Sequence, residues 1–344
     1  MIIKKSYSHN PGGSCASVSW SGVYRQQGYN FNEGEVFGLG SGLYLGYCAL
    51  TNLKYFDICL TSSSLVEDFL INTGVDLNIT QFSNGEQCLN LIKQSLDAKS
   101  PVAVQLNPNY CEGLIRVTPE SLKQYLPTHW IIIVDYNEAE EILITYDNRQ
   151  FNSVKISFDT FLLARNSGNS EQNPQNYYYD VMFNDSLYPI ESSIDLSLRK
   201  TFMNFAQIKN IQSLYVGSYG LEKLSRHIAI WDKIMTPQQL VETLNRILLS
   251  ITGAGGIKGG YRLLYADFLK TAANKSSSSD LATASKLFRD SAFHWNEFAK
   301  ALKKILNKDI PTDFEHEKSN LTSSLNKVFQ SENDGFNIIG KLVS

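Results

Sequence analysis

The sequence predicts an α+β fold followed by a helical region. To about residue 185, helical stretches come first and short apolar, aromatic segments with strand character follow them. From about residue 195, amphipathic helical stripes follow one another, separated by short Gly- and Ser-rich breaks. Helices that precede a run of consecutive strands indicate an antiparallel sheet covered by helices. We therefore predict two domains, residues 1–190 and 191–344, of which the second is all-α.

Each expected element has its own local signal. Apolar residues recur at three-to-four spacing in the expected helices, which are residues 14–27, 63–73 and 86–98. Apolar, β-branched and aromatic residues fill the expected strands, which are residues 101–106, 129–136, 141–147, 153–158 and 177–183. Residues 166–176 read as a polar loop and residues 184–194 as a linker between the domains.

Composition excludes several classes of function. A net charge of −3 with scattered basic residues gives no field that favours nucleic acid or an anionic membrane. No segment approaches the roughly 20 apolar residues of a membrane span, and the N-terminus has no signal-peptide core. Five cysteines without a CxxC pair suit neither a disulfide framework nor a zinc site. We expect a cytoplasmic protein with reduced thiols, for which a homodimer would be unremarkable.

Cys15 is the candidate nucleophile. Pro11, Gly12 and Gly13 form a turn and Ser14 is a good N-cap, so Cys15 falls in the first helical turn. Free backbone N–H groups and the positive end of the helix dipole lower the pKa of a thiol there. The same N–H groups can hold the oxyanion of a tetrahedral intermediate. The remaining cysteines lack such a setting, and we interpret them as packing residues: Cys48, Cys59, Cys88 and Cys111.

A thiolate nucleophile needs an imidazole partner, and His129 begins a predicted strand. If residues 137–140 form a hairpin turn, His129 lies opposite Asp147, which would fix the imidazole tautomer. Asn148 and Asp135 are alternatives for this third role. Asp135 lies too far along the same strand, and Asn148 points to the opposite face from Asp147.

These residues resemble a known family. The spacing between His9 and Cys15, with the segments at 32–47 and 128–137, is similar to the acyltransferase family of butirosin biosynthesis. The Cys, His, Asp order also looks like the papain-like cysteine peptidases that process bacteriocin leaders. The resemblance implies a papain-like N-terminal domain, in which a helix packs on an antiparallel sheet. It also places His9 in the oxyanion hole, where the peptidases have glutamine.

The resemblance extends to the helical half and to other site residues. Segments 220–231, 259–269 and 293–302 look like the helical domain that often follows in this family. The family's glutamate before a Phe-Gly-Leu-Gly run is matched by Glu35, which we expect to shape the floor or entrance of the site. Beside the Gly-rich loop at 253–260 we expect substrate contacts from Tyr261, Arg262 and Tyr265. The alternative is a helix start with a solvated Arg262 and two aromatic packing residues.

The implied activity is acyl transfer. By this resemblance, the enzyme moves an acyl group from a carrier-protein phosphopantetheine thioester, through Cys15, to a small amine in antibiotic biosynthesis. An amide-forming relative belongs to a thioamide-antibiotic pathway. The reaction requires neither ATP nor a metal, in keeping with the lack of a P-loop or metal-ligand spacing. Two alternatives stay open: hydrolysis by the same triad, as in a cysteine peptidase, amidase or thioesterase, and a catalytically inactive binding module.

Overall fold

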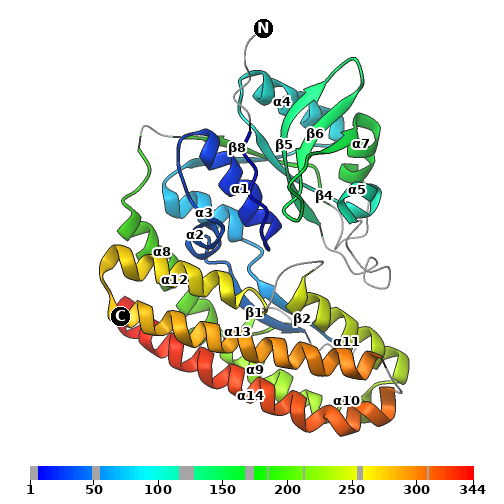
Figure 1. Cartoon of the computed structure of the whole chain (residues 1–344), viewed down its shortest axis with the longest axis vertical. Helices are drawn as coiled ribbons and strands as arrows, with labels where there is room; N and C mark the ends of the chain where they lie inside the picture. Colours follow the sequence, from blue (N-terminus) through cyan, green and yellow to red (C-terminus); the bar gives the residue numbers. More distant parts are fainter. Residues whose placement is uncertain are drawn as a thin grey trace. The chain divides into compact units, whose positions relative to one another are not determined.

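The computed structural model divides the chain into two compact units (Figure 1). Unit 1 comprises Met1–Val36 and Gly74–Leu187, and unit 2 comprises Phe37–Thr73 and Tyr188–Ser344. The structure describes residues 7–48, 55–115, 128–166, 174–183, 186–211, 214–253, 259–307 and 310–344. Most of the predicted polar loop at 166–176 and of the Gly-rich loop at 253–260 lies outside these residues.

Unit 1 is an antiparallel α+β unit. One sheet has the strand order β4 (Val102–Leu106), β5 (His129–Asn137), β6 (Ile142–Tyr146) and β7 (Val154–Ser157). A second, two-stranded sheet pairs β3 (Asp76–Gln81) with β8 (Tyr177–Met182). The helical elements are α1 (Cys15–Gln26), the start of α2 (Glu33–Leu39), α4 (Gly85–Asp97), the short turn η1 (Pro108–Tyr110), α5 (Glu112–Ile115) and α7 (Phe158–Asn166).

The apolar residues of β4, β5, α4 and α7 form the core of unit 1, with Ile92, Val104, Ile131 and Phe161 fully buried or nearly so. Helix α1 packs on β5 through small residues. A Cβ atom added to Gly22 would lie 2.9 Å from Ile132 of β5, so glycine permits this close approach. The packing brings the N-terminal end of α1 toward the sheet that carries the predicted histidine.

Unit 2 is mainly helical. Its helices are α3 (Leu65–Thr73), α8 (Ile190–Phe202), α9 (Gly217–Ile228), α10 (Trp231–Ile234), α11 (Pro237–Thr252), α12 (Arg262–Ser276), α13 (Ser279–Leu306) and α14 (Ile310–Val343), with a π-helical turn, η2 (Met203–Gln207), after α8. Figure 1 shows α13 and α14 as long neighbours, and they contact each other along their length.

The all-α prediction for the C-terminal part is wrong. Unit 2 contains a four-stranded sheet in the order β2 (Asp57–Thr61), β1 (Leu43–Cys48), β10 (Leu214–Val216) and β9 (Asn210–Ile211). Because β1 pairs with β10, as in Gly46 opposite Val216, the segment 37–73 belongs with the helical unit. A mixed helix and sheet fold with antiparallel sheets and a helical C-terminal region is confirmed.

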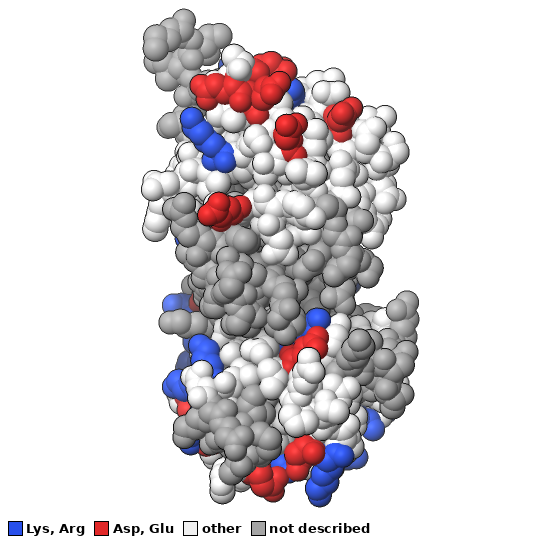
Figure 2. Space-filling model, turned by 90° about the vertical axis from the view of Figure 1, so that its right-hand side faces the viewer, with Lys and Arg blue, Asp and Glu red and all other residues white. Residues whose placement is uncertain are grey.

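The described part of the chain has no helix that is both long and apolar enough to span a membrane. On the face that Figure 2 shows, acidic and basic side chains lie in small separate groups, in keeping with the net charge of −3.

Candidate active site

Cys15 is the first residue of α1. The preceding N-cap residue, Ser14, has extended backbone angles, and its side-chain oxygen accepts a hydrogen bond from the N–H of Ser17 at 3.3 Å. The sequence therefore predicted both the helix start and its cap. Cys15 is partly exposed, whereas Ser14 and Ser17 are buried. A thiol in this first turn lies at the positive end of the helix dipole.

His129 and Asp147 form the second part of the site. His129 is the first residue of β5, and its Nε2 lies 2.6 Å from Oδ2 of Asp147, which directly follows β6. The Asp147 side chain is completely buried, and that of His129 is 14% exposed. The thiol of Cys15 hydrogen-bonds to the His129 side chain. Since Nε2 faces the carboxylate, Nδ1 is the ring nitrogen left for the thiol.

The strand register differs from the one assumed in the sequence analysis. Ile132 pairs with Tyr146, two positions further along β6 than predicted, and a bulge follows between Ile133 and Asp135. A shift of two residues keeps side chains on the same face. For this reason His129 and Asp147 still meet, as diagonal neighbours rather than as a directly opposed pair.

The three groups shift one another's pKa values. Burial opposes ionisation of Cys15, but the charge and hydrogen bond of His129 outweigh it and hold the pKa of the thiol below its ordinary value. Burial also opposes the charged form of His129, yet the Cys15 charge and the Asp147 hydrogen bond raise its pKa to about 9. These directions favour a thiolate–imidazolium pair.

Arg149 holds the carboxylate that orients His129. Its backbone N–H and its Nε donate to Oδ1 of Asp147 at 2.8 and 3.1 Å. Although burial alone would raise it, the pKa of Asp147 lies far below its usual range because of His129 first and Arg149 second. Oδ2 accepts from His129 and also, at 3.4 Å, from Nη2 of Arg149, so both carboxylate oxygens are hydrogen-bonded and Asp147 stays ionised. Arg149 has no sequence signal for this role other than its place two residues after Asp147.

His9 does not have the hydrogen bonding predicted for an oxyanion donor. Its Nε2–H donates to the backbone carbonyl of Asp147 at 2.9 Å, its ring stacks on Tyr146, and its buried Nδ1 has no hydrogen-bond partner. Burial lowers the pKa of His9, so the ring is neutral near pH 7 and carries a single proton. The single ring proton of neutral His9 is donated to the backbone carbonyl of Asp147, so in this arrangement no proton is left to donate to an oxyanion.

The N-terminus of α1 offers a backbone donor instead. The N–H of Ser14 donates to Oε1 of Glu33 at 2.5 Å, and the N–H of Ser17 serves the N-cap. Among the hydrogen bonds of the described residues, none uses the backbone N–H of Cys15. This N–H lies on the residue predicted to be the nucleophile, where the oxyanion of an acyl intermediate would form.

Comparison with known families fits this arrangement. The N-terminal family described as butirosin biosynthesis protein H matches residues 14–148, which run from the N-cap of α1 to the residue after Asp147. The family described as a domain of unknown function, DUF4872, matches residues 160–339, more than half of the chain. The chain belongs to the DUF4872 family. A search of curated proteins found no match to this sequence.

In this DUF4872 protein, Glu35 caps a helix. Its side chain accepts from the N–H of Asn32 at 3.0 Å, and the side chain of Asn32 accepts from the N–H of Glu35 at 2.9 Å. This reciprocal pair starts α2. The neighbouring acidic residue, Glu33, is the one that contacts the loop before Cys15. Both glutamates lie in the segment that the sequence singled out, and the place of Glu35 at the floor or entrance of the site stays a prediction.

Two of the three residues predicted to contact substrate beside the Gly-rich loop are buried in the core of unit 2. Arg262 is fully buried, and its guanidinium pairs with Glu332 of α14 at 2.7 and 3.0 Å. Tyr265 is also fully buried, with its ring edge-on to Phe288. Both residues therefore have core positions in unit 2, which argues against substrate contact. Tyr261 is partly exposed, in a left-handed conformation with its ring stacked on Phe37.

The other cysteines do not all pack as predicted. Cys88 and Cys111 are buried in the core of unit 1, as expected for packing residues. Cys48 is partly exposed, and Cys59 is exposed, with its thiol donating to the carbonyl of Thr61 at 3.0 Å. The packing interpretation is therefore wrong for Cys59, because alternation along the edge strand β2 turns this residue outward.

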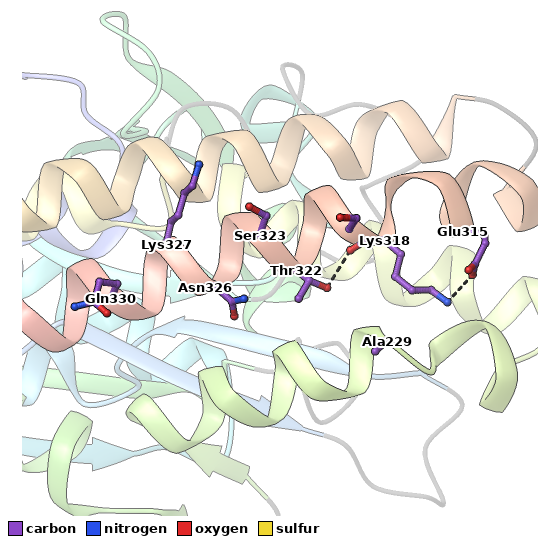
Figure 3. Close-up of a pocket in the computed structure, with 9 residues that line it drawn as sticks. Ala229, Glu315, Lys318, Thr322, Ser323, Asn326, Lys327 and Gln330 are labelled. Carbon is purple, nitrogen blue, oxygen red and sulfur yellow. Dashed lines mark hydrogen bonds and ion pairs between the residues drawn. The ribbon is translucent and has the colours of Figure 1, made fainter.

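An open groove lies on unit 2 of this DUF4872 protein (Figure 3). It has a volume of about 690 Å³ and runs along α14 beside the end of α9. It is lined by three hydroxyl residues, two amide residues, two lysines, one glutamate and Ala229, and Lys318 pairs with Glu315 at 2.5 Å. The lining contains neither cysteine nor histidine, so the groove has no thiol and no imidazole like those of Cys15 and His129.

Proposed function

We propose that this protein is a cysteine-dependent acyltransferase with a papain-like N-terminal domain and an amide as its product. The observation that carries the proposal is the hydrogen-bonded series Cys15–His129–Asp147 at the N-terminus of α1. A thiol paired with an oriented imidazole is suited to covalent catalysis at acyl groups. We assign Cys15 as nucleophile, His129 as base and acid, and Asp147 as the residue that orients His129.

In the first half-reaction, the Cys15 thiolate attacks the carbonyl carbon of a carrier-protein thioester. The backbone N–H of Cys15 stabilises the resulting oxyanion. As the bond to the pantetheine sulfur breaks, the His129 imidazolium protonates that sulfur, and a thiol leaves. The product is an acyl-Cys15 thioester with a neutral His129.

In the second half-reaction, an amine attacks the acyl-Cys15 carbonyl. Neutral His129 takes a proton from the attacking nitrogen, the bond to Sγ breaks, and the thiolate–imidazolium pair is restored. Both half-reactions balance without ATP, since a thioester is consumed and an amide is formed.

The match to butirosin biosynthesis protein H supports a place in natural-product biosynthesis, with an acyl or peptidyl carrier protein as donor partner and a small amine as acceptor. We propose that residues 1–190 carry the acyltransferase chemistry and that the helical residues 191–344 select substrates. The protein is proposed to act in the cytoplasm.

The proposal is tested by intact-protein mass spectrometry after mixing with a panel of acyl carrier thioesters. Wild type is expected to gain the mass of the acyl group, whereas Cys15→Ala gains none. An adduct that persists in Cys15→Ala would refute the assignment of the nucleophile. Wild type that acylates but discharges equally fast to water without any amine would be a thioesterase or peptidase.

A further inference from the structure

Asn148 ties the end of β6 to the loop that carries the nucleophile. Its Nδ2 donates to the carbonyls of Gly12 and Gly13 at 2.9 and 3.3 Å, and the N–H of Gly12 donates to the Asn148 carbonyl at 2.7 Å. Asn148 is only 4% exposed. Since both neighbours of the amide are carbonyls, which only accept, its nitrogen must face them. The loop before Cys15 is therefore bonded at three points to one residue.

The opposite side of this loop is also held. A Cβ atom on Gly12 would lie 2.3 Å from Oε2 of Glu33, so the loop backbone approaches this carboxylate closely. The N–H of Ser14 donates to the same side chain. The loop thus lies between Asn148 and Glu33, with no room for a side chain at Gly12.

The two consecutive residues after β6 contact the two halves of the candidate site, the His129 imidazole and the loop that carries Cys15. Asp147 turns toward His129, and Asn148 turns toward the loop before Cys15. One rigid segment therefore sets the position of the imidazole and that of the thiol. A thiol–imidazole hydrogen bond depends on placement within about 0.5 Å, so such a shared anchor controls whether the ion pair forms.

We propose that Asn148 is a positioning residue that keeps Cys15 within hydrogen-bond reach of His129 and thereby keeps the thiol ionised. Asn148 acts through the Gly12–Gly13 backbone and contacts neither the thiol nor the substrate in this role. The inference rests on the proposed function, because it concerns the same nucleophile.

The test is the rate of alkylation of Cys15 by iodoacetamide as a function of pH, with the modified peptide located by mass spectrometry. Wild type, Asn148→Ala and Asn148→Asp are compared in the full chain. Loss of the anchor is expected to raise the midpoint of the profile by about one pH unit, which slows alkylation roughly tenfold at pH values well below the wild-type midpoint. Above the ordinary thiol pKa the variants should react as fast as wild type.

The matched control is Asn137→Ala. Asn137, the last residue of β5, also hydrogen-bonds to backbone through its side chain, but its oxygen accepts from the N–H groups of Ala139 and Glu140 in the exposed turn that follows. This variant is expected to keep the wild-type midpoint. If Asn148→Ala does not fold, the near-isosteric Asn148→Asp, which replaces the donating NH₂ by a carboxylate oxygen, gives the measurement.

Each outcome separates the two proposals. If the midpoint of Cys15 alkylation is low in wild type and equally low in both Asn148 variants, even when these are less stable to heat, the positioning role is wrong and the proposed function is unaffected. A wild-type midpoint at the ordinary thiol value would overturn the proposed function and this inference together. An upward shift in the Asn148 variants but not in Asn137→Ala would support the positioning role.

Discussion

Replacing Asp147 by asparagine should do more than remove a charge. The amide has one oxygen and one NH₂ group, and Arg149 donates two hydrogen bonds to the Oδ1 position. Arg149 therefore keeps the amide oxygen on its own side and turns the NH₂ toward Nε2 of His129. A neutral imidazole that accepts there must carry its proton on Nδ1, and it can no longer take the proton of Cys15.

The size of the effect follows from these contacts. A charge-assisted hydrogen bond contributes about 1.5–3 kcal/mol, so its loss alone destabilises the imidazolium by about 10- to 150-fold. The wrong tautomer also removes the general base, which contributes roughly 10²–10⁴ in rate. We expect Asp147→Asn to slow acylation at pH 7 by about 10²–10⁴, with binding of the donor unchanged.

Single-turnover acylation, followed by quenching and intact mass measurement, reports this step directly. Asp135→Asn is the matched control, because Asp135 lies on β5 and its carboxylate accepts from the neighbouring backbone N–H of Tyr136 at 2.9 Å. The control should acylate at the wild-type rate. If Asp147→Asn stays within threefold of wild type at pH 7, the orienting role of Asp147 is wrong.

Three further predictions address the site and the core. The pKa of Cys15 is lowered and that of His129 is raised to about 9. Acylation should therefore decline above pH 9, because the imidazolium that protonates the leaving thiol is lost. Alkylation of Cys15 by iodoacetamide needs no such acid and should not decline. His9→Ala removes a neutral donor and should slow acylation only about 2- to 10-fold, against the 10²–10³ of an oxyanion donor. Glu332→Ala leaves Arg262 buried without its partner and should lower the free energy of unfolding by about 3–5 kcal/mol in denaturant titrations.

Each of these has a distinct contrary result. Acylation that keeps rising above pH 9 would mean that His129 is not the acid. A His9→Ala loss of a hundredfold or more would return the oxyanion role to His9. For Glu332, the comparison is Glu297→Ala, whose exposed pair with Lys300 contributes less than about 1 kcal/mol; equal effects of the two changes would refute the argument from burial.

Local sequence signals were enough to predict which side chains form the candidate site. The Gly-Gly turn and Ser14 predicted a helix that begins at Cys15, and its bounds are Cys15–Gln26. The contact between His129 and Asp147 was predicted although the assumed register was wrong, because the error of two residues preserved the face of the strand. The contacts of Asn148 and Arg149 depend on loop conformation, which a periodic pattern does not encode.

Long-range pairing limited the prediction elsewhere. Strands β9 and β10 have two and three residues, and they become part of a sheet only because β1 pairs with β10 some 170 positions away in sequence. Strand β3, with the sequence DLNITQ, has only two apolar residues, Leu77 and Ile79, and no buried residue, so its alternating signal is too short to predict a strand. Arg262 follows a Gly-rich loop and looked exposed, but Glu332 on α14 supplies the charge that allows its burial.

The central claim is that Cys15 carries an acyl group that an amine, rather than water, removes. The most direct measurement isolates wild-type protein loaded from an acyl carrier thioester, locates the acyl group by peptide mass spectrometry, and follows its loss with and without a panel of amines. The account predicts an acyl group on the peptide that contains Cys15, slow loss in buffer, and fast loss with an amine to give an amide of matching mass. An acyl group on another residue, or loss at the same rate in buffer as with every amine, would contradict it.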